Sequence, residues 1–126
     1  MSATNYAEQK ILDHLLGTTS FTMPAAPWIK LHTGDPGEDA TANAAGNTTR
    51  KQVTFGATAS PSGVATSTSS ADWTNVSTAE TYSWYSTWDA STGGNPLLVG
   101  QLTAAVTVAV GDNFSLPIGS LTATAA

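Results

Sequence analysis

The sequence of 126 residues contains no cysteine and only two histidines, His14 and His32. Without cysteine, the chain cannot form disulfide bonds, thiolate metal sites or a cysteine nucleophile. Its stability must come from an apolar core, and a chain of this size buries enough surface to fold without cross-links. The absence of cysteine also suits a protein that is assembled in a reducing cytoplasm.

Charged residues are scarce as well. They make up 10% of the chain, whereas an average soluble domain contains about 25%. The net charge is −5, and the only adjacent basic residues are Arg50 and Lys51, so we expect no binding to the phosphate backbone of a nucleic acid. A surface with so few charges favours a protein that packs against copies of itself or against other proteins. A monomer solvated by its Thr and Ser side chains is the alternative.

Long apolar runs and catalytic motifs are also lacking. No run reaches the roughly 20 residues that span a membrane, and the first residues, MSATNYAEQK, do not resemble a secretory signal. No serine lies in a Gly-x-Ser-x-Gly elbow, and the glycines of STGGN at 91–95 lack the lysine of a nucleotide-binding loop. We therefore expect no membrane partner, no enzymatic activity and no cofactor.

One group of residues has the chemistry of a metal site. His32, Asp35, Glu38 and Asp39 lie close together in the sequence. Their spacing matches neither an EF-hand loop nor a zinc-binding helix, and the Pro-Gly pair among them is typical of a turn. We expect an acidic turn without a metal, inside a polar loop at 34–47 that faces either solvent or a partner.

Residues 5–16 are predicted to form the only helix. Asn5 is a suitable N-cap with Glu8 in the capping-box position, and Gly17 follows as the C-terminal cap. One apolar stripe runs along this helix and consists of Ala7, Ile11, Leu12, Leu15 and Leu16. We expect this stripe to cover the open face of a sheet, and docking onto a neighbouring subunit is the alternative.

The remainder of the chain has the pattern of short β-strands separated by turns. Polar and apolar residues alternate at 28–33, and turn signals recur about every 8–12 residues, as in sandwiches and small barrels. Further predicted strands lie within 50–59, 64–73, 82–89, 97–103, 104–110 and 114–126. The predicted fold is mainly β, an antiparallel sandwich or small barrel of about seven or eight strands with one N-terminal helix. We expect a single domain, 1–126, with an arm and helix at 1–24 and the β-sandwich at 25–126.

Aromatic residues gather in TYSWYSTWDASTGGNP, at 81–96. In a regular strand, the side chains at 82, 84, 86 and 88 share one face, and Ser83, Tyr85, Thr87 and Asp89 share the other. Each large ring buries about 150–250 Å², so we predict that the rings form the core or a seam between subunits. These residues are Tyr82, Trp84, Trp88, Trp28 and Trp73. Alternatively, Trp88, Asp89 and Asn95 form a platform for a glycan.

Three stretches of the chain resemble a known family. They are TNYAEQKILDHLLG, PWIKLHTGDPGED with the later RKQVTFG, and WDASTGGNPLLVGQLTAAVTVAVGDNFSLPIGSLT. In this order they are similar to small virion proteins of tailed bacteriophages, which include tail-fibre-like and minor structural proteins. Ile11 stands where the helix pattern of the family has Leu, and residues 56–80 carry no diagnostic motif. The resemblance implies a virion component with a β-sandwich fold and no catalytic residues.

The resemblance does not say which part of the virion contains the protein. The chain has neither the heptads nor the repeats of a long fibre shaft. We therefore expect a non-enzymatic capsid decoration (cement) or minor capsid protein, which stabilises the shell through repeated contacts with the major capsid protein and with copies of itself as a homotrimer. Such a protein is assembled in the host cytoplasm and lies on the capsid surface. The alternative is a tail-fibre or tail-tip protein that binds a host-surface glycan.

Overall fold

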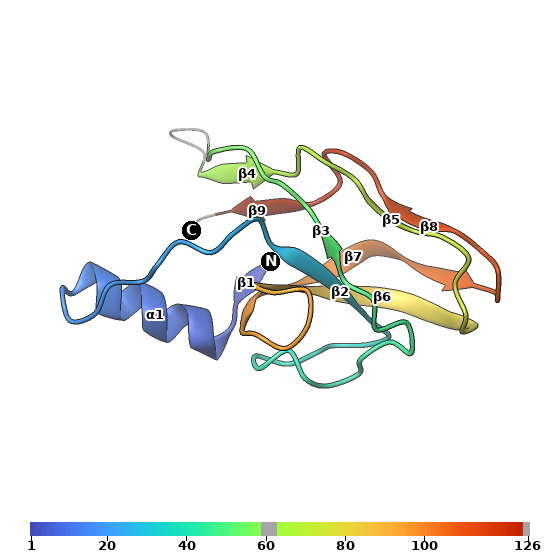
Figure 1. Ribbon diagram of the computed structural model, residues 1–126, viewed down its shortest axis with the longest axis horizontal. Helices are drawn as coiled ribbons and strands as arrows, with labels where there is room; N and C mark the ends of the chain where they lie inside the picture. Colours follow the sequence, from blue (N-terminus) through green and yellow to red (C-terminus); the bar gives the residue numbers. More distant parts are fainter. Residues whose placement is uncertain (59–62, 125–126) are drawn as a thin grey trace.

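The computed structural model describes residues 1–58 and 63–124, which form two layers of strands with a helix at one end (Figure 1). The larger layer is a five-stranded sheet with the order β1-β7-β6-β2-β3. In this order the strands are Ser2–Ala3, Pro96–Val108, Glu80–Trp88, Trp28–His32 and Lys51–Gln52. Every neighbouring pair is antiparallel.

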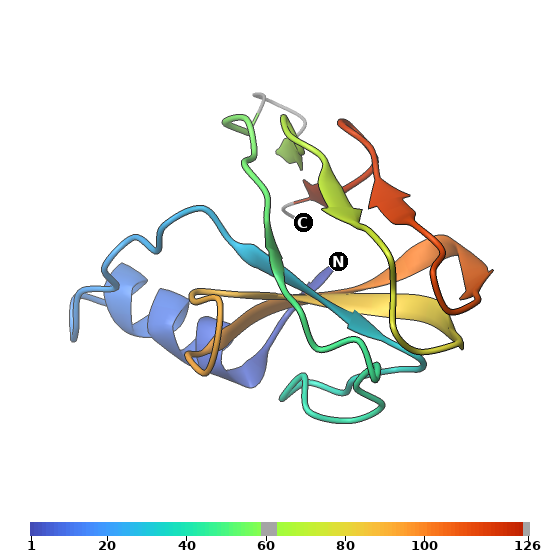
Figure 2. The ribbon, with the colours of Figure 1, turned by 45° about the vertical axis from the view of Figure 1, so that its right-hand side comes forward.

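The second layer consists of two short antiparallel pairs that lie over the sheet (Figure 2). β4 (Val64–Thr66) pairs with β9 (Thr122–Thr124), and β5 (Ala71–Trp73) pairs with β8 (Phe114–Leu116). The prediction of a mainly β, antiparallel fold with one N-terminal helix is confirmed. The strands of the described residues do not close into a barrel.

The described residues contain nine strands, because the predicted segments divide differently in the structure. The segment 64–73 is two strands, and so is 114–126, in which a turn with Gly119 at φ +83° separates β8 from β9. The segments 97–103 and 104–110, in contrast, belong largely to one strand, β7. Residues 59, 125 and 126 of the predicted strands lie outside the described residues.

The chain passes from one layer to the other directly after β3. Val53 still donates its N–H to the carbonyl of Pro27 beside the sheet, at 2.9 Å. Two residues later, Phe55 forms a bridge with Ser67 of the second layer. The predicted strand at 50–59 is therefore shared between the layers, and it joins them along one side of the sandwich.

The core lies between the two layers and depends on a few large rings. Phe114 of β8 is 5.1 Å from Tyr82 of β6 and 5.7 Å from Trp73 of β5, measured between ring centroids. Ile29 and Leu31 of β2 are fully buried in the same cluster. Because these rings come from both layers, they hold the layers together.

α1 (Asn5–Leu15) begins one residue earlier than a cap at Asn5 requires. The N-cap is Thr4, whose hydroxyl accepts a hydrogen bond from the N–H of Ala7 at 3.2 Å and donates one to the carbonyl of Pro96 at 2.7 Å. The prediction of Asn5 as the N-cap is wrong because Thr4 still continues the extended path of β1. Gly17, at φ +73°, follows the helix in the left-handed conformation that a C-terminal cap requires.

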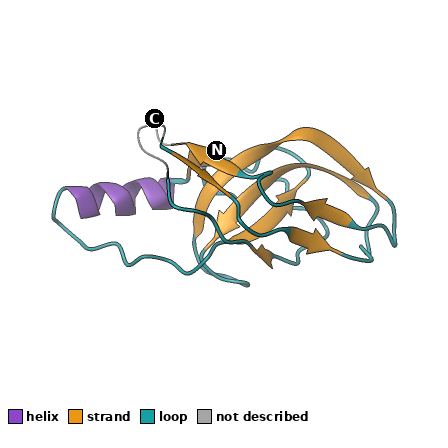
Figure 3. Ribbon diagram, turned by 90° about the horizontal axis from the view of Figure 1, so that it is seen from above, coloured by secondary structure: helices purple, strands orange, loops and turns teal. Residues whose placement is uncertain are grey.

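The helix does not cover the sheet. It leaves the strands after its first turn and projects from one end, and the segment 17–27 returns beside it to β2 (Figures 1 and 3). Only Ala7 of the apolar stripe is buried, while Leu15 and Leu16 are 74% and 69% exposed. The expectation that the stripe covers the sheet is therefore wrong. We call residues 5–27 the helical arm. In the described part of the chain, no helix is both long enough and apolar enough to cross a membrane.

Candidate binding surfaces

An irregularity in the sheet divides the aromatic residues between its two faces. Tyr82 pairs with Val106, but Trp84 pairs with Gln101, so one residue of β6 lies opposite four residues of β7. Such a bulge resets the alternation of side chains. Tyr82 therefore joins Tyr85 in the core between the layers, whereas Trp84 lies on the outer face. The expectation that Tyr82 shares a face with Trp84 and Trp88 is wrong for this reason.

Trp73 also lies in the core, away from the outer face. Its indole N–H donates to the carbonyl of Thr49 at 2.7 Å. The remaining three tryptophans pack together with Ala40 and Val99 on the outer face, and we call them the outer tryptophan cluster: Trp28, Trp84 and Trp88. Trp28 lies directly opposite Trp88 in the pairing of β2 with β6.

Two basic side chains cover Trp88. The guanidinium of Arg50 lies 4.1 Å from the centroid of the Trp88 ring, and the ammonium of Lys30 lies 5.4 Å from it. Arg50 is held in place because its Nη1 donates to the carbonyls of Ala90 and Gly93, each at 2.8 Å. Trp88 as a whole is only 8% exposed. Burial lowers the pKa of Lys30, and the neighbouring charge of Arg50 lowers it further.

Asp89 and Asn95 bond to one another across a tight turn. One carboxylate oxygen of Asp89 accepts the backbone N–H of Asn95 at 2.7 Å, and the other accepts its side-chain amide at 3.1 Å. Gly94 fills the turn at φ +71°, where a Cβ would collide with Asp89. The structure thus brings Trp88, Asp89 and Asn95 together. Asp89 and Asn95 close the turn and Arg50 covers the Trp88 ring, so the site does not present an open ring with free polar groups.

His32 is buried beneath the outer tryptophan cluster and is bonded at both ring nitrogens. Its Nδ1 lies 3.0 Å from the carbonyl of Ala42 and its Nε2 lies 2.8 Å from the hydroxyl of Ser86. Because a carbonyl only accepts, Nδ1 carries the proton and Nε2 accepts from Ser86, which in turn accepts the indole N–H of Trp88 at 2.8 Å. Burial lowers the pKa of His32, with a smaller contribution from Lys30. This ring has no lone pair left for a metal.

The acidic residues near His32 serve the loop at 34–47 instead. Asp35 accepts the N–H of Gly37 at 2.9 Å, and Asp39 accepts the side-chain amide of Asn5 at 3.0 Å. Within residues 1–58 and 63–124, no three histidine, aspartate or glutamate side chains gather as a metal site would require. The loop thus connects the start of α1 to the outer face of the sheet.

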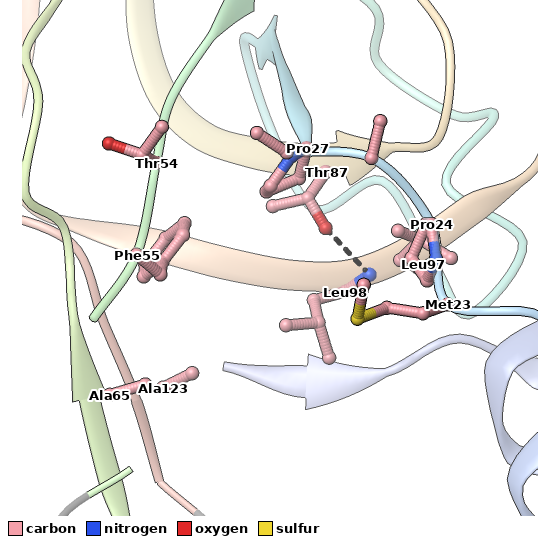
Figure 4. A pocket seen from close by; sticks show the side chains of 12 residues that line it. Met23, Pro24, Pro27, Thr54, Phe55, Ala65, Thr87, Leu97, Leu98 and Ala123 are labelled. Carbon is pink, nitrogen blue, oxygen red and sulfur yellow. Dashed lines mark hydrogen bonds between the residues drawn. The ribbon is translucent and has the colours of Figure 1, made fainter. Parts of the chain in front are cut away.

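At the end of the sandwich that carries the helical arm, the space between the layers is open. A cavity of about 420 Å³ lies there, which we call the interlayer mouth (Figure 4). Phe55, Ala65 and Ala123 form the wall on the side of the second layer, and Leu97 and Leu98 form the wall on the side of the sheet. The segment Met23–Pro27, at the root of the arm, closes the remaining side.

Sequence reasoning did not find this mouth. Alanines at positions 25, 26, 65 and 123 contribute little side-chain volume to its lining, opposite Leu97 and Leu98 of the sheet. An alternating strand pattern predicts which residues point inward, but it does not reveal that the inward side chains are too small to meet. The signal available in the sequence was the small side chains themselves, of which Ala65 and Ala123 pair with one another within the second layer.

Exposed apolar side chains gather on the arm beside the mouth. Among the described residues, five of the eight large exposed apolar side chains lie between residues 11 and 23. They are Ile11, Leu12, Leu15, Leu16 and Met23. Within the part of the chain that the structure describes, the arm therefore carries most of the large exposed apolar side chains, while most of the aromatic rings are covered.

Comparison with known families identifies the class of protein to which this two-layered β fold, with its covered rings and exposed apolar arm, belongs. The chain matches a family of phage virion structural proteins over residues 2–124, which confirms the predicted resemblance. It belongs to the family Gp80, described as podophage GP4 fiber I protein gp80. No curated protein matches the chain.

Proposed function

We propose that the chain is a non-enzymatic structural subunit of a phage fibre and works through protein–protein contacts. The observation that carries this proposal is the match to a fibre protein family over residues 2–124. The apolar helical arm supports it, because exposed apolar surface of this kind marks interaction sites. The fibre role thereby replaces capsid decoration as the preferred assignment within the virion.

The polar groups of the structure support a role without catalysis. His32 is neutral and bonded at both nitrogens, so it has no free nitrogen with which to act as a general base. Asp89 is bonded to Asn95 through both carboxylate oxygens. The groups that could do acid–base chemistry near the aromatic rings are thus used to hold the fold together.

Capsid decoration remains the second candidate, because the low charge of the chain suits a protein packed in a lattice. In that role the partners are the major capsid protein and further copies of this chain, arranged as a homotrimer on the capsid surface. The two candidates differ in copy number, since a decoration protein covers the whole shell whereas fibres are few.

Glycan recognition through Trp88, Asp89 and Asn95 is disfavoured by the geometry. A sugar stacks on an open aromatic face, but Arg50 already lies on the Trp88 ring at 4.1 Å. Binding of a purified, folded chain to a glycan array would revive this candidate, provided that it is lost in a Trp88→Ala variant that remains folded.

Quantitative mass spectrometry of purified virions, combined with labelled antibodies in electron microscopy, tests the proposed function. We expect a low copy number relative to the major capsid protein and label on the fibres. A copy number in the hundreds, with label over the whole shell, would assign the protein to the capsid instead. Absence from purified virions would contradict both assignments.

A further inference from the structure

The hydroxyl of Tyr85 forms no hydrogen bond within residues 1–58 and 63–124, although Tyr85 is only 4% exposed. The other buried tyrosine differs, because the hydroxyl of Tyr82 accepts the side-chain amide of Asn47 at 3.3 Å. A buried hydroxyl without a partner is costly. In this part of the chain, every side-chain polar atom that is sealed from solvent has a partner, so the hydroxyl of Tyr85 reaches open space.

That space is a pocket of about 170 Å³ beside the irregular part of β7, and we call it the bulge pocket. Tyr85 lies opposite Gly100 of β7, and its hydroxyl and ring fill the place where a Cβ at Gly100 would stand. The side chain therefore leans over β7 and lines the pocket there. Residues 101–103 form one wall, and residues 116 and 120–122 from the second layer form another. The bulge pocket shares no lining residue with the interlayer mouth.

The chemistry of the lining defines the class of ligand, since no side chain in it carries a charge. Without a carboxylate, the pocket does not suit a metal cation, and without lysine or arginine it does not suit a phosphate or carboxylate group. Its polar side chains can all both donate and accept hydrogen bonds, as the hydroxyl groups of a ligand do. They are Tyr85, Gln101, Thr103, Ser120 and Thr122. The other lining side chains are apolar and suit the C–H faces of a ring: Met1, Leu102, Leu116 and Leu121.

We propose that the bulge pocket binds a neutral, hydroxyl-rich molecule of the size of a single sugar ring, and that the hydroxyl of Tyr85 donates a hydrogen bond to it. The pocket of about 170 Å³ is several times larger than the roughly 30 Å³ that one water molecule takes up. It is smaller than the about 300–1,000 Å³ of sites for drug-sized ligands, so it admits one ring and not a longer chain.

The state of the Tyr85 hydroxyl suits this role. Burial raises the pKa of Tyr85 to about 12, so the hydroxyl keeps its proton at neutral pH and is available as a donor. A ligand this small nevertheless binds weakly. At the binding efficiency per atom of ordinary ligands, a ring with about 12 non-hydrogen atoms has a dissociation constant on the order of millimolar.

Nuclear magnetic resonance of the isotope-labelled, purified chain tests the inference, because it detects weak binding residue by residue. The probes are D-glucose, D-galactose and D-mannose, which are titrated separately. We expect at least one of them to shift the backbone amide signals of residues 100–103 and Leu121 in a saturable way, and to leave the signals of the helical arm unchanged.

Tyr85→Phe isolates the contribution of the hydroxyl, and Tyr82→Phe is the matched control. Tyr85→Phe removes no hydrogen bond within the described part of the chain, so we expect its urea midpoint to be unchanged or higher. Its affinity for the sugar should be at least about threefold lower. Tyr82→Phe removes the bond from Asn47, so its urea midpoint should fall while its affinity for the sugar stays unchanged.

The inference is overturned if none of the three sugars shifts the signals of the pocket, or if the shifts lie elsewhere on the surface. Equal affinity of Tyr85→Phe and the natural chain also overturns it. So does a fall in the urea midpoint of Tyr85→Phe as large as that of Tyr82→Phe, since that result would give the Tyr85 hydroxyl a partner inside the chain. The inference goes beyond the proposed function and concerns the purified chain, so its failure leaves the fibre assignment to the virion copy count.

Discussion

The two ends of the sandwich differ in how the space between the layers is filled. At the end where β5 pairs with β8, the rings of Trp73, Tyr82 and Phe114 pack across the gap. At the end where β4 pairs with β9, Ala65 and Ala123 face a cavity of about 420 Å³. Large rings fill the space between the layers at one end and stabilise the fold there, whereas smaller side chains leave a cavity open at the other end.

The largest effect is expected from truncation of the filled end. Phe114→Ala removes a buried ring that touches both Trp73 and Tyr82, and we expect it to lower the free energy of unfolding by about 3–5 kcal/mol. Leu15→Ala removes an exposed side chain at the other end and should change it by less than about 0.5 kcal/mol. Urea unfolding followed by tryptophan fluorescence measures both. If both variants lost similar amounts of unfolding free energy, the proposed difference between the two ends would be contradicted.

A crowded contact within the core provides the next test. A Cβ at Gly100 of β7 would collide with the ring of Tyr85 in the neighbouring strand, so we expect Gly100→Ala to cost about 1–3 kcal/mol of unfolding free energy. Gly56→Ala is the matched control, because its Cβ would find no atom closer than 3.6 Å. If Gly100→Ala left the free energy of unfolding unchanged, the core would be able to accommodate the added methyl group without a loss of stability.

Removal of the Arg50 side chain that lies over Trp88 should have a smaller effect on the free energy of unfolding. Arg50→Ala removes a cation–π contact and two hydrogen bonds to carbonyls, and we expect a loss of about 1–2 kcal/mol. Quenching of tryptophan fluorescence by acrylamide should rise as the ring becomes accessible. Lys51→Ala, at the adjacent position, is the control. Unchanged quenching would mean that Trp88 is shielded by other groups.

The smallest effect is a dependence of stability on pH that arises from His32. Its pKa is lowered by burial in the folded chain, whereas an unfolded chain has the ordinary value near 6.5. Below that pH the unfolded chain binds a proton that the folded chain does not, so stability falls as the pH drops. Urea midpoints at pH 7.5 and 5.5 should differ in the natural chain and in His14→Gln, and differ less in His32→Gln. If the urea midpoint changed equally with pH in the natural chain and in both variants, the neutral, bonded state of His32 would be contradicted.

Much of the fold was predictable because it depends on local patterns. The alternation at Trp28–His32 and the turn signals gave the antiparallel β fold, and the apolar stripe with Gly17 gave the helix. The cap was misplaced by one residue because Thr4 is fixed by Pro96, a contact across 92 positions of the sequence. Local signals do not contain such a constraint.

The surfaces were less predictable because they depend on how strands are aligned. The bulge between Tyr82 and Trp84 arises from the register of β6 with β7, and no pattern within β6 reveals it. The cation–π contact between Arg50 and Trp88 likewise joins residues from distant parts of the chain. The sequence predicted that the rings at 82–88 form the core or a seam, with a glycan platform as the alternative, but it did not reveal which rings lie on which face of the sheet. It also did not reveal that the leucines of the arm are exposed.

The most direct test is the reactivity of two cysteine variants before and after assembly. Leu15→Cys and Val110→Cys place a thiol at positions that are 74% and 68% exposed in the free chain, and a maleimide should label both quickly there. In purified virions we expect the thiol at position 15 to be strongly protected relative to the thiol at position 110. Labelling at position 15 that is as fast in virions as in the free chain would contradict the role of the arm as the contact surface.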